Sequence, residues 1–184
     1  MDLQPNKTLV IVNGYPTAGK DSFIDFCNNY IGLEWTYHFK SSVKMSSVEV
    51  IKEAAKLLGY TGQKTDNERN FLAELKNLAT KHFNHSFNYI TQAVKDRSFD
   101  IYFVMVREPS EIEKLVEFYK YSDVKVLTLL VRRDKDLLVE NDADKNVLEY
   151  KYDICIDNKN SLDDLQLLAK EFVDKHIVLK PKIR

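Results

Sequence analysis

The sequence predicts an α/β protein with a doubly wound, five-stranded parallel sheet. Two features of the chain carry this prediction. Short apolar runs, such as residues 9–12, are unbroken, which is typical of parallel strands covered on both faces. These runs alternate with longer segments whose apolar residues recur at helical spacing, and that order is typical of a parallel sheet with helices on either side.

Each expected strand is a short run rich in β-branched or aromatic residues. The first contains Leu-Val-Ile-Val, and the third reads Ile-Tyr-Phe-Val-Met-Val and is ended by Pro109. Trp35, Tyr37 and Phe39 alternate on one face of a shorter run, which is interpreted as the second strand. The five strands are expected at residues 7–13, 35–39, 100–106, 124–131 and 152–156.

The expected helices follow glycine or residues that cap helix N-termini. One helix is expected over about residues 19–30, three within a long polar stretch at about 44–98, one after the third strand and one from Ser161. Three of these helices begin with pairs at the spacing of a capping box. The pairs are Ser46 with Glu49, Thr65 with Glu68, and Ser110 with Glu113.

Length and composition predict one cytoplasmic domain. The chain has 184 residues, and a domain usually has about 100–200. Its two cysteines, Cys27 and Cys155, lie far apart, which excludes a paired-cysteine metal motif and favours a reducing compartment. No apolar run is long enough for a transmembrane helix, and the first residues lack the pattern of a signal peptide. The net charge of −1 argues against a nucleic-acid partner.

The single domain, residues 1–184, is expected to have a core and two inserted segments. The core covers about 7–43 and 99–176. A helical insert for the acceptor covers about 44–98, after the second strand. A shorter, charged and lid-like segment covers about 132–150, after the fourth strand.

The turn between the first strand and the first helix carries the most specific motif. It reads G-x-x-x-x-G-K, in which backbone N–H groups converge on phosphate oxygens and the lysine reaches the terminal phosphates. The motif requires a preceding strand and a following helix, and both are predicted here. The expected nucleotide-binding residues are Gly14, Tyr15, Thr17, Ala18, Gly19, Lys20, Asp21 and Ser22.

The residue after the lysine departs from the usual motif, in which a Ser or Thr hydroxyl ligates Mg²⁺. Asp21 occupies that position, and the hydroxyl follows at Ser22. The carboxylate could bind Mg²⁺ through water, or could simply favour the positive end of the helix, and both interpretations stay open. Asp21 and Ser22 are therefore the expected metal residues. Close to phosphates, the charge of Asp21 needs a compensating cation.

The motif and three further stretches resemble the phage-type deoxynucleoside monophosphate kinases and animal phosphomevalonate kinases. Both families carry G-K-D in this loop, as this chain does at residues 19–21. Residues 39–44 are similar to their F-A-D-P-L-K segment, although its Asp and Pro are absent. Residues 106–112 have an arginine where these kinases have one, and residues 152–165 match their Y-D-x-x-I-x-N-x-x-S-L-x-x-L ending. The resemblance implies a nucleotide-kinase-like P-loop NTPase fold with ATP and Mg²⁺ as cofactors.

Three arginines directly follow apolar strands, at the edge where open α/β sheets bind ligands. Arg107 is expected to hold the phosphate of the acceptor, and Arg132 and Arg133 to neutralise the transferring group. The alternative is that these arginines form surface ion pairs with nearby acids. With Lys20, they are the expected catalytic residues. No strand ends in the aspartate of a Walker B motif, and Glu108 is the nearest acid.

The sequence thus predicts an ATP-dependent phosphotransferase. The resemblance implies transfer of the γ-phosphate of ATP to a (deoxy)nucleoside monophosphate. One alternative is a kinase for another small phosphorylated acceptor. The other is a regulatory or interaction protein that binds nucleotide without transferring phosphate, which the missing Walker B acid favours. A homodimer is compatible with either function.

Overall fold

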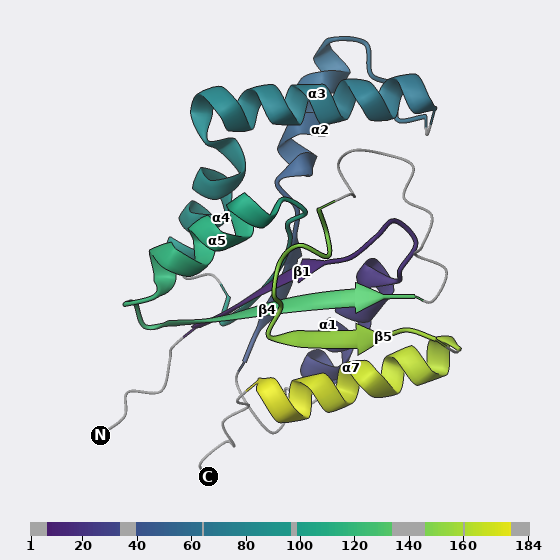
Figure 1. Cartoon of the computed structure of the whole chain (residues 1–184), viewed down its shortest axis with the longest axis vertical. Helices are drawn as coiled ribbons and strands as arrows, with labels where there is room; N and C mark the ends of the chain where they lie inside the picture. The colour runs from purple at the N-terminus through teal and green to yellow at the C-terminus, as the bar shows by residue number, and fades with distance from the viewer. Residues whose placement is uncertain are drawn as a thin grey trace. The chain divides into compact units, whose positions relative to one another are not determined.

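The computed structural model describes residues 7–33, 40–63, 65–96, 99–133, 146–159 and 161–177. The chain forms two compact units, of which one contains the sheet and the other is helical (Figure 1). The sheet unit combines Met1–Met45 with Arg97–Arg184, and the helical unit is Ser46–Asp96.

The sheet has five strands in the order β2–β3–β1–β4–β5, and all four neighbouring pairs are parallel. This confirms the predicted five-stranded parallel sheet. All carboxyl ends lie at one edge, and the turn after the central strand β1 lies there between the ends of β3 and β4. The strands are β1 (Lys7–Asn13), β2 (Ser42–Met45), β3 (Ile101–Met105), β4 (Val124–Arg132) and β5 (Ile154–Asp157).

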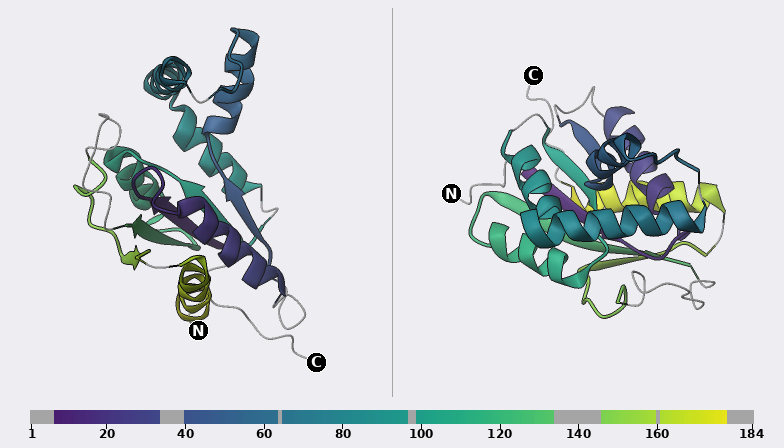
Figure 2. Two further views of the ribbon diagram at one scale, coloured as in Figure 1. Left: turned by 90° about the vertical axis from the view of Figure 1, so that its right-hand side faces the viewer. Right: turned by 90° about the horizontal axis from the view of Figure 1, so that it is seen from above.

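Helices cover both faces of the sheet (Figure 2). The connection from β1 to β2 runs toward one side of the sheet and that from β3 to β4 toward the other, so right-handed crossovers place their helices on opposite faces. The first crossover contains α1 (Lys20–Leu33) and the second contains α5 (Pro109–Tyr119). The last helix, α7 (Leu162–His176), packs beside α1.

The core beneath α1 and α7 holds the strand–turn–helix unit in place. Val10 and Val12 of β1 are fully buried there with apolar residues of both helices. Phe23 of α1 and Phe172 of α7 meet edge to face, with ring centroids 5.6 Å apart. Each such side chain contributes about 1.5–3 kcal/mol by leaving water, so this packing fixes where α1 begins relative to β1.

The helical unit contains α2 (Val48–Leu57), α3 (Asp66–Phe83) and α4 (His85–Lys95). Thr65 caps α3, since its hydroxyl accepts the N–H of Glu68 at 3.3 Å, which is one of the two bonds of the predicted capping box. The carboxylate of Glu68 accepts from the N–H and hydroxyl of Thr61 instead of bonding back to Thr65. Asn84 ends α3 in the left-handed conformation, at φ 53°, and α4 begins at the next residue. No helix in the described part of the chain is both long and apolar enough to cross a bilayer.

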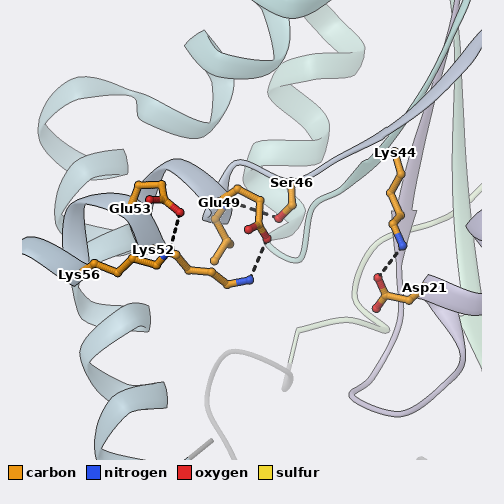
Figure 3. A network of polar contacts seen from close by, with 8 residues as sticks. Asp21, Lys44, Ser46, Glu49, Lys52, Glu53 and Lys56 are labelled. Atoms are coloured by element: carbon orange, nitrogen blue, oxygen red, sulfur yellow. Dashed lines mark hydrogen bonds and ion pairs between the residues drawn. The ribbon is translucent and has the colours of Figure 1, made fainter. Parts of the chain in front are cut away.

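The other two predicted capping pairs are wrong. Helix α2 has Ser47 as its N-cap, and the carboxylate of Glu49 pairs with Lys52 at 2.8 Å instead of bonding back to Ser46 (Figure 3). Helix α5 begins at Pro109, so Ser110 lies inside it. Proline suits a first helical position because it has no N–H to satisfy and its φ is already helical.

The second strand also differs from the prediction. Residues 35–39, with Trp35, Tyr37 and Phe39, lie outside the described residues. The strand that pairs with β3 is Ser42–Met45, which aligns Lys44 with Phe103. Lys44 is thereby held near the carboxyl edge of the sheet.

Candidate active site

The turn between β1 and α1, residues 14–19, is called the phosphate loop below. Pro16 and Thr17 are exposed, and Thr17 is left-handed at φ 65°. The N–H of Ala18 donates to the carbonyl of Tyr15 at 3.3 Å, and the N–H of Phe23 donates to the carbonyl of Gly19 at 2.9 Å. The first N–H groups of α1 have no partner within the helix, so this end can bind an anion.

Two glycines let the phosphate loop pack against the rest of the site. A Cβ on Gly14, at φ 147°, would lie 2.1 Å from the carbonyl oxygen of Val131 in β4. A Cβ on Gly19, at φ 98°, would lie 2.5 Å from the amide nitrogen of Asn158. Both positions therefore require glycine, because of their conformation and because of the close approach.

Asn13, the last residue of β1, fixes the start of the loop and is fully buried. Its Oδ1 accepts the N–H of Gly14 at 2.8 Å. Its Nδ2 donates to the carbonyl of Arg107 at 2.9 Å and to the hydroxyl of Tyr152 at 2.7 Å. The Tyr152 hydroxyl donates onward to the carbonyl of Val147 at 2.8 Å. Burial raises the pKa of Tyr152 to about 12, although the bond from Asn13 opposes the shift.

Asn158, in the stretch after β5, fixes the far end of the loop. Its Nδ2 donates to the carbonyl of Ala18 at 2.8 Å, and its backbone N–H donates to the carbonyl of Arg132 at 2.8 Å. The side chain is buried, and its Oδ1 has no hydrogen-bond partner. Neither Asn13 nor Asn158 is among the site residues expected from the sequence. The only local signals were an asparagine directly before Gly14 and another in the C-terminal stretch.

The side chain of Lys20 is buried against the phosphate loop. Only 9% of the residue is exposed. Its ammonium donates to the carbonyls of Gly14 at 2.5 Å and Tyr15 at 2.6 Å. The two carbonyl oxygens help to satisfy the charge of this buried ammonium.

Asp21 lies on the first turn of α1 and is exposed. The ammonium of Lys44 lies 3.3 Å from Oδ1 of Asp21 (Figure 3). It also lies 2.7 Å from Oδ1 of Asp25. Partial burial opposes the charged form of Lys44, but the hydrogen bonds and charges of Asp25 and Asp21 together raise its pKa. Lys44 is thus the compensating cation that the sequence predicts for Asp21.

The three arginines lie at the carboxyl edge, and all are exposed. Arg107 follows β3, and Asn13 holds its carbonyl. Arg132 ends β4 and donates from Nε and Nη2 to both carboxylate oxygens of Asp157, the second at 3.3 Å. The hydrogen bond from Arg132 lowers the pKa of Asp157. Arg132 therefore forms a surface ion pair, as the alternative interpretation of the arginines expects, and its partner Asp157 lies in the neighbouring strand β5. Arg133 is the next residue along the chain.

Asp21 and Ser22 present the type of ligand that Mg²⁺ prefers. Both offer oxygen atoms from the first turn of α1, and neither is buried. Among the described residues, no group of three His, Cys, Asp or Glu side chains could hold a metal ion. Mg²⁺ bound with phosphates needs only one or two protein ligands, so the residues fit this ion.

Comparison with known proteins supports the fold. No family model matches the sequence, and no curated protein matches it. A structure from Chloroflexus aurantiacus, provisionally assigned as a kinase, is similar with a TM-score of 0.53 and 13% identity, covering 92% of this chain and 97% of the other. The tunicamycin resistance protein of Deinococcus radiodurans is similar with a TM-score of 0.50 and 11% identity, covering 97% and 100%. Together with the parallel sheet and the loop after β1, these similarities show that the chain has a P-loop NTPase fold.

Proposed function

We propose that the chain is an ATP-dependent phosphotransferase. The observation that carries the proposal is the phosphate loop, which joins the central strand to α1 with Lys20 folded against its carbonyls. Arginines follow β3 and β4 at the same edge of the sheet, where charge develops during phosphoryl transfer. The similarity to a structure with a provisional kinase assignment supports the same class of reaction.

Catalysis at such a site consists mostly of positioning and charge neutralisation. The N–H groups of the first turn of α1 bind phosphate oxygens, and Lys20 exchanges its two carbonyl partners for oxygens of the terminal phosphates. Asn13 and Asn158 hold the phosphate loop at its two ends. The loop is therefore already ordered before the nucleotide binds, and binding does not have to supply the free energy of ordering it. Mg²⁺, when bound, would be held by Asp21 and Ser22 and would neutralise charge on the phosphates.

The proposed acceptor is a (deoxy)nucleoside monophosphate. This rests on the resemblance of the G-K-D motif and the C-terminal stretch to monophosphate kinases. The acceptor of such a kinase is an ionised phosphate, so its oxygen can attack without a general base from the protein. Arg107 suits this acceptor because a guanidinium can bond two phosphate oxygens at once.

A screen of acceptors tests the function. ADP formation is measured with ATP, Mg²⁺ and each ribo- and deoxynucleoside monophosphate, and with phosphomevalonate and dephospho-coenzyme A. We expect turnover with at least one deoxynucleoside monophosphate. Turnover only with another phosphorylated compound would support the proposed phosphotransferase activity and contradict the proposed acceptor.

Lys20→Met tests the phosphate site independently of the acceptor. Removing the ammonium should weaken Mg·ATP binding, measured by calorimetry, about tenfold or more, since a hydrogen bond to a charged group contributes roughly 1.5–3 kcal/mol. Lys120→Met is the matched control, because Lys120 lies at the C-terminal end of α5 and pairs with Glu117 at 3.2 Å. Equal ATP affinity in Lys20→Met and the wild type would contradict the assignment.

One specific observation favours a second candidate function, nucleotide binding without transfer. Neither β3 nor β4, the two neighbours of β1, ends in an aspartate or has one as its next residue; Val106 comes next after β3 and Arg133 after β4. Strand β5 does end in an aspartate, Asp157, but this side chain pairs with Arg132. A protein that binds ATP in the micromolar range, but gives no turnover across the whole acceptor screen, would have this function instead.

A further inference from the structure

Lys44 joins two carboxylates of α1 that would otherwise repel each other. Asp21 and Asp25 are one helical turn apart, so they share a face of α1, and like charges at this spacing are unfavourable. The ammonium of Lys44 lies within 3.3 Å of the first and 2.7 Å of the second. Lys44 comes from β2, and it reaches α1 near the carboxyl edge of the sheet (Figure 3).

The charge of Asp21 is unfavourable for the proposed nucleotide. Asp21 follows Lys20 directly, on the helix turn whose N–H groups are aimed at phosphates. The helix end contributes about half a positive charge, and a full negative charge on its first turn cancels that attraction. A Ser or Thr at this position would carry no such cost. The acid is therefore tolerated beside a polyphosphate only if a cation accompanies it.

We propose that Lys44 is a positioning residue for nucleotide binding, which acts by neutralising Asp21 and is itself held in place by Asp25. Asp21 and Lys44 together then replace the uncharged hydroxyl of the usual motif. This inference rests on the proposed function, because it requires a polyphosphate ligand at the phosphate loop.

Two other roles of Lys44 lead to different results. If the ion pair only fastens β2 to α1, its loss changes the melting temperature but not the affinity for ATP. If Lys44 contacts the nucleotide directly, its loss weakens binding whatever residue occupies position 21. Only neutralisation makes the effect of Lys44 depend on the charge of Asp21.

The experiment measures the affinity for ATP by calorimetry in EDTA, so that metal binding by Asp21 does not contribute. The variants are Lys44→Met, Asp21→Asn and the double variant, with Lys120→Met as the control for net charge. Lys120 follows α5, which runs from the carboxyl end of β3 to the amino end of β4, so it lies at the opposite edge of the sheet. Each variant is first checked for a cooperative melting transition.

We expect Lys44→Met to weaken ATP binding about fivefold to tenfold. This is the effect of one unneutralised unit charge at roughly 10 Å from a phosphate charge in a partly aqueous site. The double variant should bind within about twofold of the wild type. Asp21→Asn alone should bind at least as tightly as the wild type, and Lys120→Met should be unchanged. The loss in Lys44→Met should shrink in about 0.5 M salt, because exposed charges are screened.

A double variant as weak as Lys44→Met would overturn the inference, and so would a loss that salt leaves unchanged. An unchanged affinity in Lys44→Met would overturn it too. A wild-type chain that binds no ATP, with or without Mg²⁺, would instead overturn the proposed function and this inference with it.

Discussion

Asn13 donates a hydrogen bond to the hydroxyl of Tyr152 at 2.7 Å, across 139 residues of sequence. The same amide group bonds to the carbonyl of Arg107 and to the N–H of Gly14. One buried side chain therefore joins the end of β1, the phosphate loop, the exit of β3 and the stretch before β5. Buried polar networks of this kind are costly when one member is lost, since the remaining groups stay without partners.

Tyr152→Phe tests the network. The substitution leaves the Nδ2 of Asn13 and the carbonyl of Val147 each short of one hydrogen bond. We expect the free energy of unfolding, measured with urea, to fall by about 1–3 kcal/mol. Tyr121→Phe is the control, because Tyr121 is 88% exposed and should change stability by less than about 0.5 kcal/mol. Equal effects of the two substitutions would show that the Tyr152 hydroxyl does not support the fold.

The raised pKa of Tyr152 predicts a loss of stability in alkali. Its ordinary pKa is 10.0, and burial raises this to about 12 in the folded chain. Below pH 10 both states keep the proton, and between pH 10 and about 12 only the unfolded state loses it. Stability therefore falls with rising pH across this range.

Tyr152 is only partly buried, so its share of the alkaline loss should be near 1 kcal/mol rather than the roughly 2.7 kcal/mol of a full shift. The measurement is urea unfolding at pH 9 to 12 for the wild type and for Tyr152→Phe. The variant should lose less stability than the wild type over this interval. Parallel curves would mean that Tyr152 ionises equally in both states.

The glycines offer a matched pair of substitutions. Gly19→Ala places a methyl group 2.5 Å from the Asn158 amide at a φ of 98°, and should cost about 2–4 kcal/mol of stability and weaken ATP binding. Gly32→Ala lies inside α1 with no atom within 4 Å, and should stabilise the chain by up to about 1 kcal/mol. Thermal unfolding and ATP calorimetry distinguish the two. A Gly19→Ala protein that binds ATP like the wild type would contradict the described loop conformation.

The sequence predicted the sheet because its signals are local. Four of the five strands are apolar runs, and the phosphate loop is a contiguous motif between one such run and a helix. The second strand lacks this signal. Ser42–Met45 reads Ser-Val-Lys-Met, pairs with β3 alone and has no fully buried residue. An edge strand of this kind takes its conformation from its neighbour, so pattern alone does not locate it.

The site contacts depend on the tertiary fold, and this limits what sequence can predict. The charge of Asp21 predicts that a cation must lie nearby, but only the β2–β3 register identifies Lys44. The asparagines that hold the phosphate loop act across the sheet, as Asn158 does on Ala18. Such contacts leave no periodic trace in the chain, because each needs a single residue at the end of a strand.

Arg107→Ala tests the proposed acceptor site. If Arg107 binds the acceptor phosphate equally in the ground and transition states, its loss should raise the acceptor KM about tenfold or more and change kcat little. Steady-state kinetics with both substrates varied gives the two constants. Arg107→Lys should restore part of the affinity, since lysine keeps the charge and loses the planar fork. An unchanged acceptor KM in Arg107→Ala would place the acceptor elsewhere.

Arg132 and Arg133 should differ in their kinetic effects, because Arg132 is held within the sheet by Asp157 of β5, whereas Arg133 comes after the end of β4. We expect Arg133 to be the residue that meets the transferring group. Its loss removes an interaction made in the transition state, so Arg133→Ala should lower kcat about a hundredfold or more with a smaller change in KM.

Arg132→Ala should leave kcat near the wild-type value and cost less than about 1 kcal/mol of stability, as for an exposed ion pair. The same kinetic assay, with urea unfolding of both variants, separates the two arginines. A normal kcat in Arg133→Ala with a reduced one in Arg132→Ala would reverse the assignment, and would mean that Arg132 leaves Asp157 when the substrates bind.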